Sequence, residues 1–123
     1  MEIRWSEPHR VAVIDPRGDL GIRSMVSIKN AVGTLLQDGC RTVIVDCQGV
    51  ERVEAMGLGV LVERMCRARE QGGTLVLARV GPTLAARMRD LRVDSLLAAF
   101  DSIQAALNAT VGVQAGAAEA LAA

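Results

Sequence analysis

Short runs of β-branched and aliphatic residues recur along the chain, and each run is bounded by residues that favour turns. Runs of this kind are typical of buried β-strands. They occupy residues 11–14, 42–46 and 74–78. Residues 2–6 predict one further short strand at a sheet edge, because Pro8 follows and would end it.

Between these runs the apolar residues recur every three or four positions, which is the period of an amphipathic helix. The predicted helices cover residues 22–38, 57–71, 82–91 and 102–109. The predicted buried face of the first helix consists of Ile22, Met25, Val26, Val32, Leu35 and Leu36. Gly39 stands where a left-handed cap would end that helix. Residues 47–55 are expected to form a loop.

The order of these elements predicts an α/β fold. Strands that alternate with helices indicate right-handed crossovers and a mostly parallel sheet. Each predicted helix has one apolar stripe, so we expect the helices to pack on one face of a small sheet. The other face would then be exposed or covered by a partner. A chain of 123 residues suits one domain, which we assign to residues 1–110, followed by an Ala-rich tail at residues 111–123.

The charge balance argues against nucleic acid as a direct partner. The chain has 14 basic and 14 acidic residues, and its aromatic residues are Trp5 and Phe100. A basic patch and stacking platforms for bases are therefore not indicated. No run approaches the 18 apolar residues of a membrane-spanning helix, and no apolar signal segment opens the chain. We expect a cytoplasmic protein without membrane insertion.

Catalytic chemistry finds little support in the sequence. His9 lies in a turn, and no nucleophile elbow surrounds any serine or cysteine. The spacing of Cys40, Cys47 and Cys66 fits neither a zinc site nor a disulfide framework, so we expect buried or half-buried free thiols. We predict no catalytic residue, no metal and no cofactor. An enzyme or small-ligand binder stays open as an alternative, and it would need a convergent polar pocket.

The segment Glu54-Ala55-Met56-Gly57-Leu58-Gly59 precedes the second long helix and holds no hydroxyl, thiol, imidazole or amine. Gly57 and Gly59 resemble the start of a dinucleotide fingerprint, but Val62 stands at the third glycine and a loop, not a strand, precedes the motif. What remains is shape: two glycines, the free N–H groups of a helix start and an exposed methionine. These are properties of a docking surface.

Four segments taken together carry a resemblance to a known family. They are Val43-Ile44-Val45-Asp46, Gly57-Leu58-Gly59-Val60-Leu61, the stretch from Arg67 to Leu77, and the ending from Leu91 to Leu107 with Phe100-Asp101-Ser102. Their order and spacing resemble the STAS domain of bacterial anti-sigma factor antagonists over about residues 10–109. The resemblance implies a small sheet with helices on one side. It also implies a regulator of transcription that works by partner switching, with an anti-sigma factor that is a kinase-like ATPase as its partner.

The resemblance fails at the phosphorylation site. In these antagonists the segment usually reads Asp-Ser-Ser-Gly-Leu-Gly, and phosphorylation of the second serine adds about −1.5 to −2 charges that expel the partner. Here Glu54 stands at the Asp, Ala55 at the first Ser and Met56 at the phosphoacceptor. The family's Gly-x-Leu-Asp turn ends here in Gly21. The resemblance therefore implies a module that docks without this phosphorylation switch.

The predicted partner-binding surface combines the turn, the segment before the second helix and the exposed face of that helix. It consists of Gly18, Asp19, Leu20, Gly21, Glu54, Ala55, Met56, Gly57, Leu58, Gly59, Glu63, Arg64 and Arg67. A structural subunit of a transport ATPase or of a signalling scaffold stays open as the alternative function. Self-association is open as well, since the apolar residues 96–99 and the tail are compatible with it, although core packing explains residues 96–99 equally well.

Overall fold

The computed structural model describes residues 1–111, which contain seven strands and four helices. The strands are β1 (Glu2–Ser6), β2 (Val11–Asp15), β3 (Gly18–Leu20), β4 (Thr42–Asp46), β5 (Val50–Val53), β6 (Thr74–Ala78) and β7 (Ala99–Phe100). The helices are α1 (Ile22–Gln37), α2 (Ala55–Glu70), α3 (Pro82–Asp90) and α4 (Ile103–Thr110). The predicted helices and the strands at residues 2–6, 11–14, 42–46 and 74–78 are thereby confirmed. The predicted tail lies, apart from Val111, outside the described residues.

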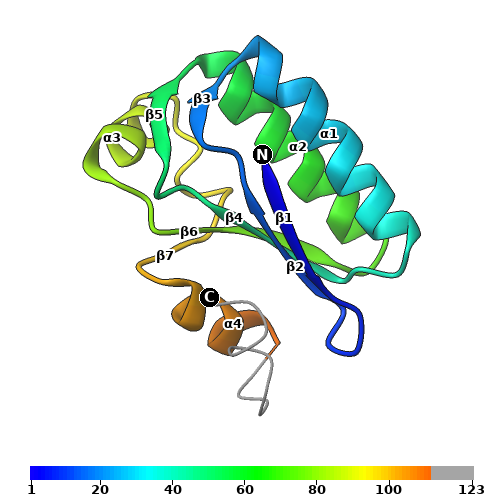
Figure 1. Ribbon diagram of the computed structural model, residues 1–123. Coiled ribbons are helices and arrows are strands. Elements are labelled where there is room, and N and C mark those ends of the chain that lie inside the picture. The colour runs from blue at the N-terminus through cyan, green and yellow to red at the C-terminus, as the bar shows by residue number, and fades with distance from the viewer. Residues whose placement is uncertain (112–123) are drawn as a thin grey trace.

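The main sheet has five strands in the order β1-β2-β4-β6-β7 (Figure 1). β1 runs antiparallel to β2, and every other neighbouring pair is parallel. The predicted α/β class with a mostly parallel sheet is confirmed. β2, β4 and β6 are almost fully buried, as expected for strands covered on both faces.

Both faces of the sheet carry helices. Successive residues of a strand point to opposite faces, so one strand contributes to two separate cores. Val43 and Val45 of β4 join a core with α1, α2 and α3, whereas Ile44 joins a second core with α4. In Figure 1, α1 and α2 lie side by side on one face and α4 lies on the other. The expectation that all helices share one face is therefore wrong for α4. The inward residues of that helix, Ile103, Ala106 and Leu107, cover the opposite side of β4 and β6.

A second, two-stranded sheet was missed in the sequence. β3 and β5 pair in parallel, in segments that we predicted to be a turn and a loop. Both strands are short, and Glu51 and Arg52 of β5 are exposed, so the apolar alternation of a half-buried strand is absent. This small sheet leads directly into α1 and α2 and sets where both helices begin.

The predicted buried face of α1 is partly wrong. Met25, Val32, Leu35 and Leu36 are buried as predicted, and Ile28 joins them. Ile22 and Val26 instead point outward, each with 61% of its surface exposed. The packed face of α1 is therefore rotated away from Ile22 and Val26, which leaves both on the surface. None of the helices in the described part of the chain is long and apolar enough to cross a membrane.

Candidate docking site

The end of β3 and the start of α2 meet with their backbones in close contact. The N–H of Glu54 donates to the carbonyl oxygen of Leu20 at 2.9 Å. A Cβ atom added at Gly57 would lie 2.3 Å from that same oxygen, a distance that no side chain can occupy. Leu58, the next residue, is fully buried in the core. Gly57 and Leu58 therefore hold α2 against β3, and neither is accessible to a partner.

The segment at residues 54–59 forms the N-cap and first turn of α2, which begins at Ala55, two residues before the predicted start at residue 57. Its outward residues are Ala55, Met56 and Gly59, and Met56 has 54% of its surface exposed. A Cβ atom at Gly59 would meet no other group within 4 Å, so the fold does not require glycine there. The exposed half of the segment is thus a helical turn with a methionine at its tip.

Glu54 is the N-cap residue of α2, yet its side chain accepts no capping hydrogen bond. The carboxylate lies instead over Gly21, the N-cap residue of α1, where the absence of a side chain leaves room for it. Glu54 and Ile22 line one hollow together with Asp19 and Arg23. The starts of α1 and α2 therefore form one continuous surface.

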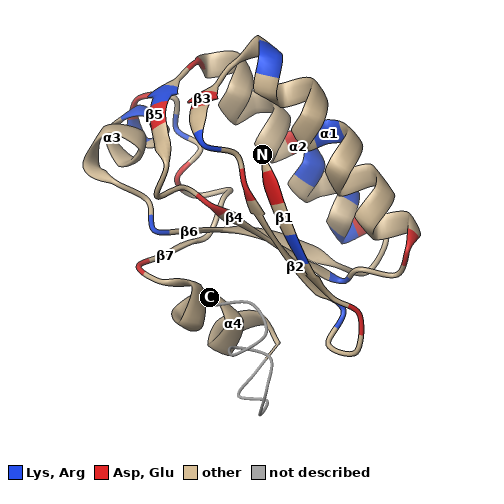
Figure 2. Ribbon diagram, in the orientation of Figure 1, with Lys and Arg blue, Asp and Glu red and all other residues tan. Residues whose placement is uncertain are grey.

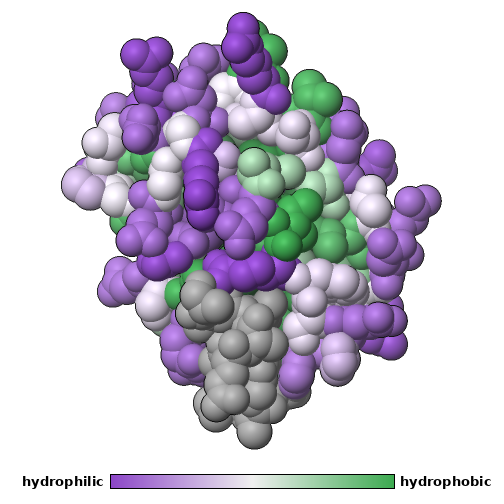
Figure 3. Space-filling view, in the orientation of Figure 1, coloured by the Kyte–Doolittle hydropathy of each residue, from purple (hydrophilic) through white to green (hydrophobic). Residues whose placement is uncertain are grey.

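Exposed apolar residues collect on this surface. Ile22 and Val26 lie one helical turn apart on α1, and Met56 follows Glu54 on the neighbouring α2. Figure 3 shows hydrophobic residues over the N-terminal end of α1 and between α1 and β1. We refer to Ile22, Val26 and Met56 as the apolar surface. Ile22 and Val26 are not among the predicted site residues, because their spacing also fits a buried helix face.

The other predicted site residues divide by exposure. Asp19, Glu54, Ala55, Met56, Gly59, Glu63 and Arg67 are exposed, and Gly18 is half-buried. Leu20, Gly21, Gly57, Leu58 and Arg64 are buried. The expectation that Arg64 lies on the exposed face of α2 is wrong, since it is 7% exposed and donates hydrogen bonds to the carboxylate of Glu63.

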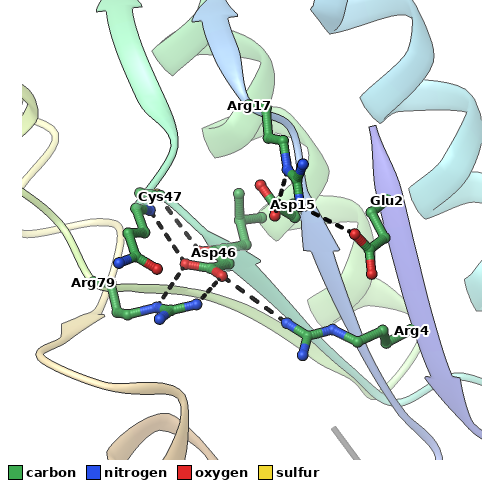
Figure 4. A network of polar contacts seen from close by, with 9 residues as sticks. Glu2, Arg4, Asp15, Arg17, Asp46, Cys47 and Arg79 are labelled. Carbon is green, nitrogen blue, oxygen red and sulfur yellow. Dashed lines mark hydrogen bonds and ion pairs between the residues drawn. The ribbon is translucent and has the colours of Figure 1, made fainter. Parts of the chain in front are cut away.

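Charged side chains hold the strand ends from which β3 and β5 depart (Figure 4). Asp46, at the end of β4, is 2% exposed and receives both Nε and a terminal nitrogen of Arg79, with the Nε contact at 3.0 Å. Its Oδ1 also accepts the N–H of Gln48 at 3.2 Å, which fixes the chain toward β5. At the end of β2, Arg17 bridges Asp15 and Glu2 at 3.0 and 3.2 Å. This network positions the small sheet under the docking site.

The titratable groups do not form a reactive centre in the described part of the chain. Burial raises the pKa of the Cys40 thiol to about 11 and that of Cys47 to about 12, so both stay protonated near neutral pH. Cys66 is exposed, which corrects the expectation of a buried or half-buried thiol there. No group of three or more His, Cys, Asp or Glu residues within residues 1–111 could hold a metal ion.

Comparison with known proteins identifies the fold. The chain is similar to the anti-sigma factor antagonist SpoIIAA in its unphosphorylated form, with 17% identity over 90% of this chain and 96% of that one and a TM-score of 0.75. An anti-sigma factor antagonist from Mycobacterium paratuberculosis gives 17% identity, coverage of 89% and 91%, and a TM-score of 0.75. The STAS domain of a SulP transporter from Vibrio cholerae gives 15% identity over 85% of this chain and 83% of that one, with a TM-score of 0.68.

These likenesses establish the architecture, which both antagonists and a transporter domain share. Comparison with curated proteins gives no match to this chain. The family assignment comes from the sequence itself, because residues 3–98 match the family described as "Mlab, STAS domain". That match covers most of the described residues and all strands of the small sheet. The resemblance inferred from the sequence is thereby confirmed, and the chain belongs to the STAS domain family.

Proposed function

We propose that this protein is an interaction module of bacterial partner switching, similar to an anti-sigma factor antagonist, that binds its partner without phosphorylation of the 54–59 segment. The observation that carries the proposal is the exposed side chain of Met56 in the first turn of α2. In the antagonist pattern this position holds the phosphoacceptor serine. Here the position holds an exposed thioether, and the neighbouring helix α1 exposes Ile22 and Val26, so the surface favours a constant apolar contact over a charge-controlled one.

The partner in this proposal is an anti-sigma factor of the kinase-like ATPase type, and the module itself carries out no catalysis. Affinity capture from cells of the source organism, followed by mass spectrometry, tests this directly. We expect a small ATPase that holds a sigma factor. Met56→Asp should abolish its recovery, because the substitution places a carboxylate in an apolar contact. Leu96→Asp is the matched control, since Leu96 is similarly exposed but lies outside the apolar surface.

Phosphorylation gives a second test of the same proposal. A cognate kinase should leave residues 54–59 unlabelled, because the segment offers no hydroxyl group. A phosphate found by mass spectrometry at Ser27 or Thr83, which are both exposed, would point to a switch that has moved and would contradict unswitched binding. Ser24 is a poorer acceptor, since its hydroxyl already contacts the N–H of Gly21 and the carbonyl oxygen of Asp19.

A second function is favoured by a separate observation. The matching family description names Mlab, and a SulP transporter domain shares the architecture. The alternative is therefore a STAS-type subunit of a transport ATPase or of a signalling scaffold. The same capture experiment separates the two functions. Stable recovery of a transporter ATPase or a scaffold, with no sigma-holding kinase, would replace the antagonist proposal by this one.

A further inference from the structure

A groove of about 560 Å³ lies between the C-terminal halves of α1 and α2, further along the same two helices that carry the apolar surface. Its charged lining residues are Lys29 from α1 and Arg64 and Arg67 from α2. No carboxylate is among the described residues that line it. Figure 2 shows basic positions in the middle of α1 and along the C-terminal half of α2. We refer to this feature as the basic groove.

The three cations that line the basic groove outnumber the two carboxylates that pair with them, Glu63 and Glu70. Glu63 accepts hydrogen bonds from Arg64, and these bonds, together with the attraction of Arg64, Lys29 and Arg67, hold its pKa below the usual range. Arg67 additionally lies 3.9 Å from the exposed carboxylate of Glu70. Even when both carboxylates are counted against the three cations, one positive charge remains without compensation.

Gly33 opens the groove at its α1 wall. A Cβ atom at this position would meet no other group within 4 Å, so packing within the described chain does not require glycine. Glycine in the interior of a helix nevertheless destabilises it relative to alanine. The missing side chain gives an incoming group access to the helix backbone at the centre of the groove.

The basic groove and the apolar surface follow one stripe along α1. Ile22, Val26, Lys29, Gly33 and Gln37 succeed one another at intervals of three or four residues, so they face the same way. At about 1.5 Å per residue, the stripe is about 22 Å long, or about four helical turns. It is apolar at the N-terminal end of α1 and carries Lys29 in the middle, and beyond that point it lines the groove whose other two cations, Arg64 and Arg67, come from α2.

We propose that this stripe binds a helix of the protein partner that is apolar at one end and acidic at the other, with its carboxylates in the basic groove. The inference rests on the proposed function and adds the chemistry of the partner and its direction along α1. Charge complementarity selects the acidic end, and continuity with the apolar surface selects the apolar end. No aromatic side chain is among the described residues that line the groove, so a nucleobase would find no stacking surface.

The test uses a fluorescein-labelled helical peptide with two leucines in its first turn and glutamates at i, i+4 spacing in the next two turns. We expect it to bind the purified protein with an affinity that falls as salt rises, and to shift the amide resonances of Gly33 and Thr34 in ¹H–¹⁵N spectra. The same peptide with lysine in place of glutamate should not bind. Equal binding of both peptides, or no binding of either, overturns the proposal.

Variants locate the site. The pair Lys29→Glu and Arg67→Glu should weaken peptide binding at least about tenfold, because two attractions become repulsions. Gly33→Leu should weaken it without any change of charge, while the protein stays folded. The matched pair Arg69→Glu and Arg89→Glu makes the same charge change at exposed positions outside the groove and should leave binding intact. An equal loss in both pairs would show a non-specific effect of net charge and overturn the proposal.

Capture of the natural partner separates this inference from the proposed function. If Met56→Asp abolishes capture and the groove pair does not, the proposed function stands and the acidic helix is wrong. If Met56→Asp leaves capture intact, the proposed function fails whatever the peptide does. If an oligonucleotide of 15 nucleotides displaces the acidic peptide as well as unlabelled peptide does, the groove is a general anion site and the inference is overturned.

Discussion

The carboxylate of Glu54 occupies the space beside Gly21 into which a side chain at that position would project. A Cβ atom at Gly21 would lie 2.8 Å from both Cδ and Oε1 of Glu54, well inside van der Waals contact. The backbone of Gly21 is extended, with φ at −144°, so its conformation alone would accept any residue. The two positions that depart together from the antagonist pattern are thus in contact, and the missing side chain at one leaves room for the longer side chain at the other.

This contact predicts a coupled pair. Gly21→Asp should lower the free energy of unfolding by about 1 kcal/mol, because the new carboxylate meets that of Glu54. In the background of Glu54→Ser the same substitution should cost clearly less, which a double-mutant cycle in urea measures directly. Glu54→Gln separates steric overlap from charge repulsion, since it keeps the size of the side chain and removes its charge. Additive effects of the two changes would mean that the residues do not interact.

Two glycines of the α2 start should respond in opposite ways to the same substitution. Gly57→Ala should destabilise the protein by about 2 kcal/mol or more, because its Cβ would meet the Leu20 carbonyl oxygen at 2.3 Å, where backbone must move. Gly59→Ala should stabilise it by up to about 1 kcal/mol, since the methyl group meets open space and alanine favours the helix. Chemical denaturation of both variants is the measurement. Similar effects at the two positions would contradict the close contact between α2 and β3.

Replacing Arg79 should lower the free energy of unfolding more than most substitutions of partly exposed residues, because Arg79 pairs with the buried Asp46. Arg79→Ala leaves the carboxylate of Asp46 buried without its two strongest donors, and Arg4 at 4.0 Å is too distant to replace them. We expect a loss of about 2–4 kcal/mol in the free energy of unfolding. Arg17→Ala is the control, because that exposed ion pair with Asp15 and Glu2 is expected to leave stability unchanged. Comparable losses for both variants would argue against a special role of the Asp46 pair.

Alkaline pH should unfold the protein through its buried thiols. Because burial raises the pKa of Cys47 from 9.0 to about 12, the unfolded chain loses the thiol proton first as pH rises. This contribution to stability is complete below about pH 9 and is lost between about pH 9 and 12, at no more than about 1.4 kcal/mol per pH unit for one thiol. The chain has one lysine, Lys29, and no tyrosine, so few other groups titrate there.

Urea denaturation in buffers at several pH values between about 8 and 11 measures how the free energy of unfolding changes with pH. Cys47→Ala should flatten the pH dependence, even though the smaller side chain lowers stability at neutral pH. Cys66→Ala should leave the slope as it is, because Cys66 is exposed in both states. A slope that is unchanged in Cys47→Ala would assign the alkaline transition to another group.

The sequence by itself determined the class of the fold and most of its elements. Runs such as residues 42–46 and 74–78 place apolar residues on both faces, which is typical of a buried strand. The helices followed from their period, and Gly39 ends α1 with the left-handed φ of +98° that its position predicted. These features are local, since each depends on a few neighbouring residues. The loss of the phosphoacceptor at Met56 is likewise a matter of sequence alone.

Only the tertiary structure decided which side of each element faces a neighbour. A helix with apolar residues at 22, 25, 26 and 28 can be rotated to bury different subsets of them. The packing of α1 against the sheet and α2 buries Ile28 and leaves Ile22 and Val26 exposed. β5 exists because it pairs with β3, which lies 32 to 33 residues earlier in the chain and whose own three residues give no strand signal. Gly57 acts through a carbonyl group on another strand. The apolar surface and the basic groove arise from these non-local contacts, so no pattern along the chain could reveal them.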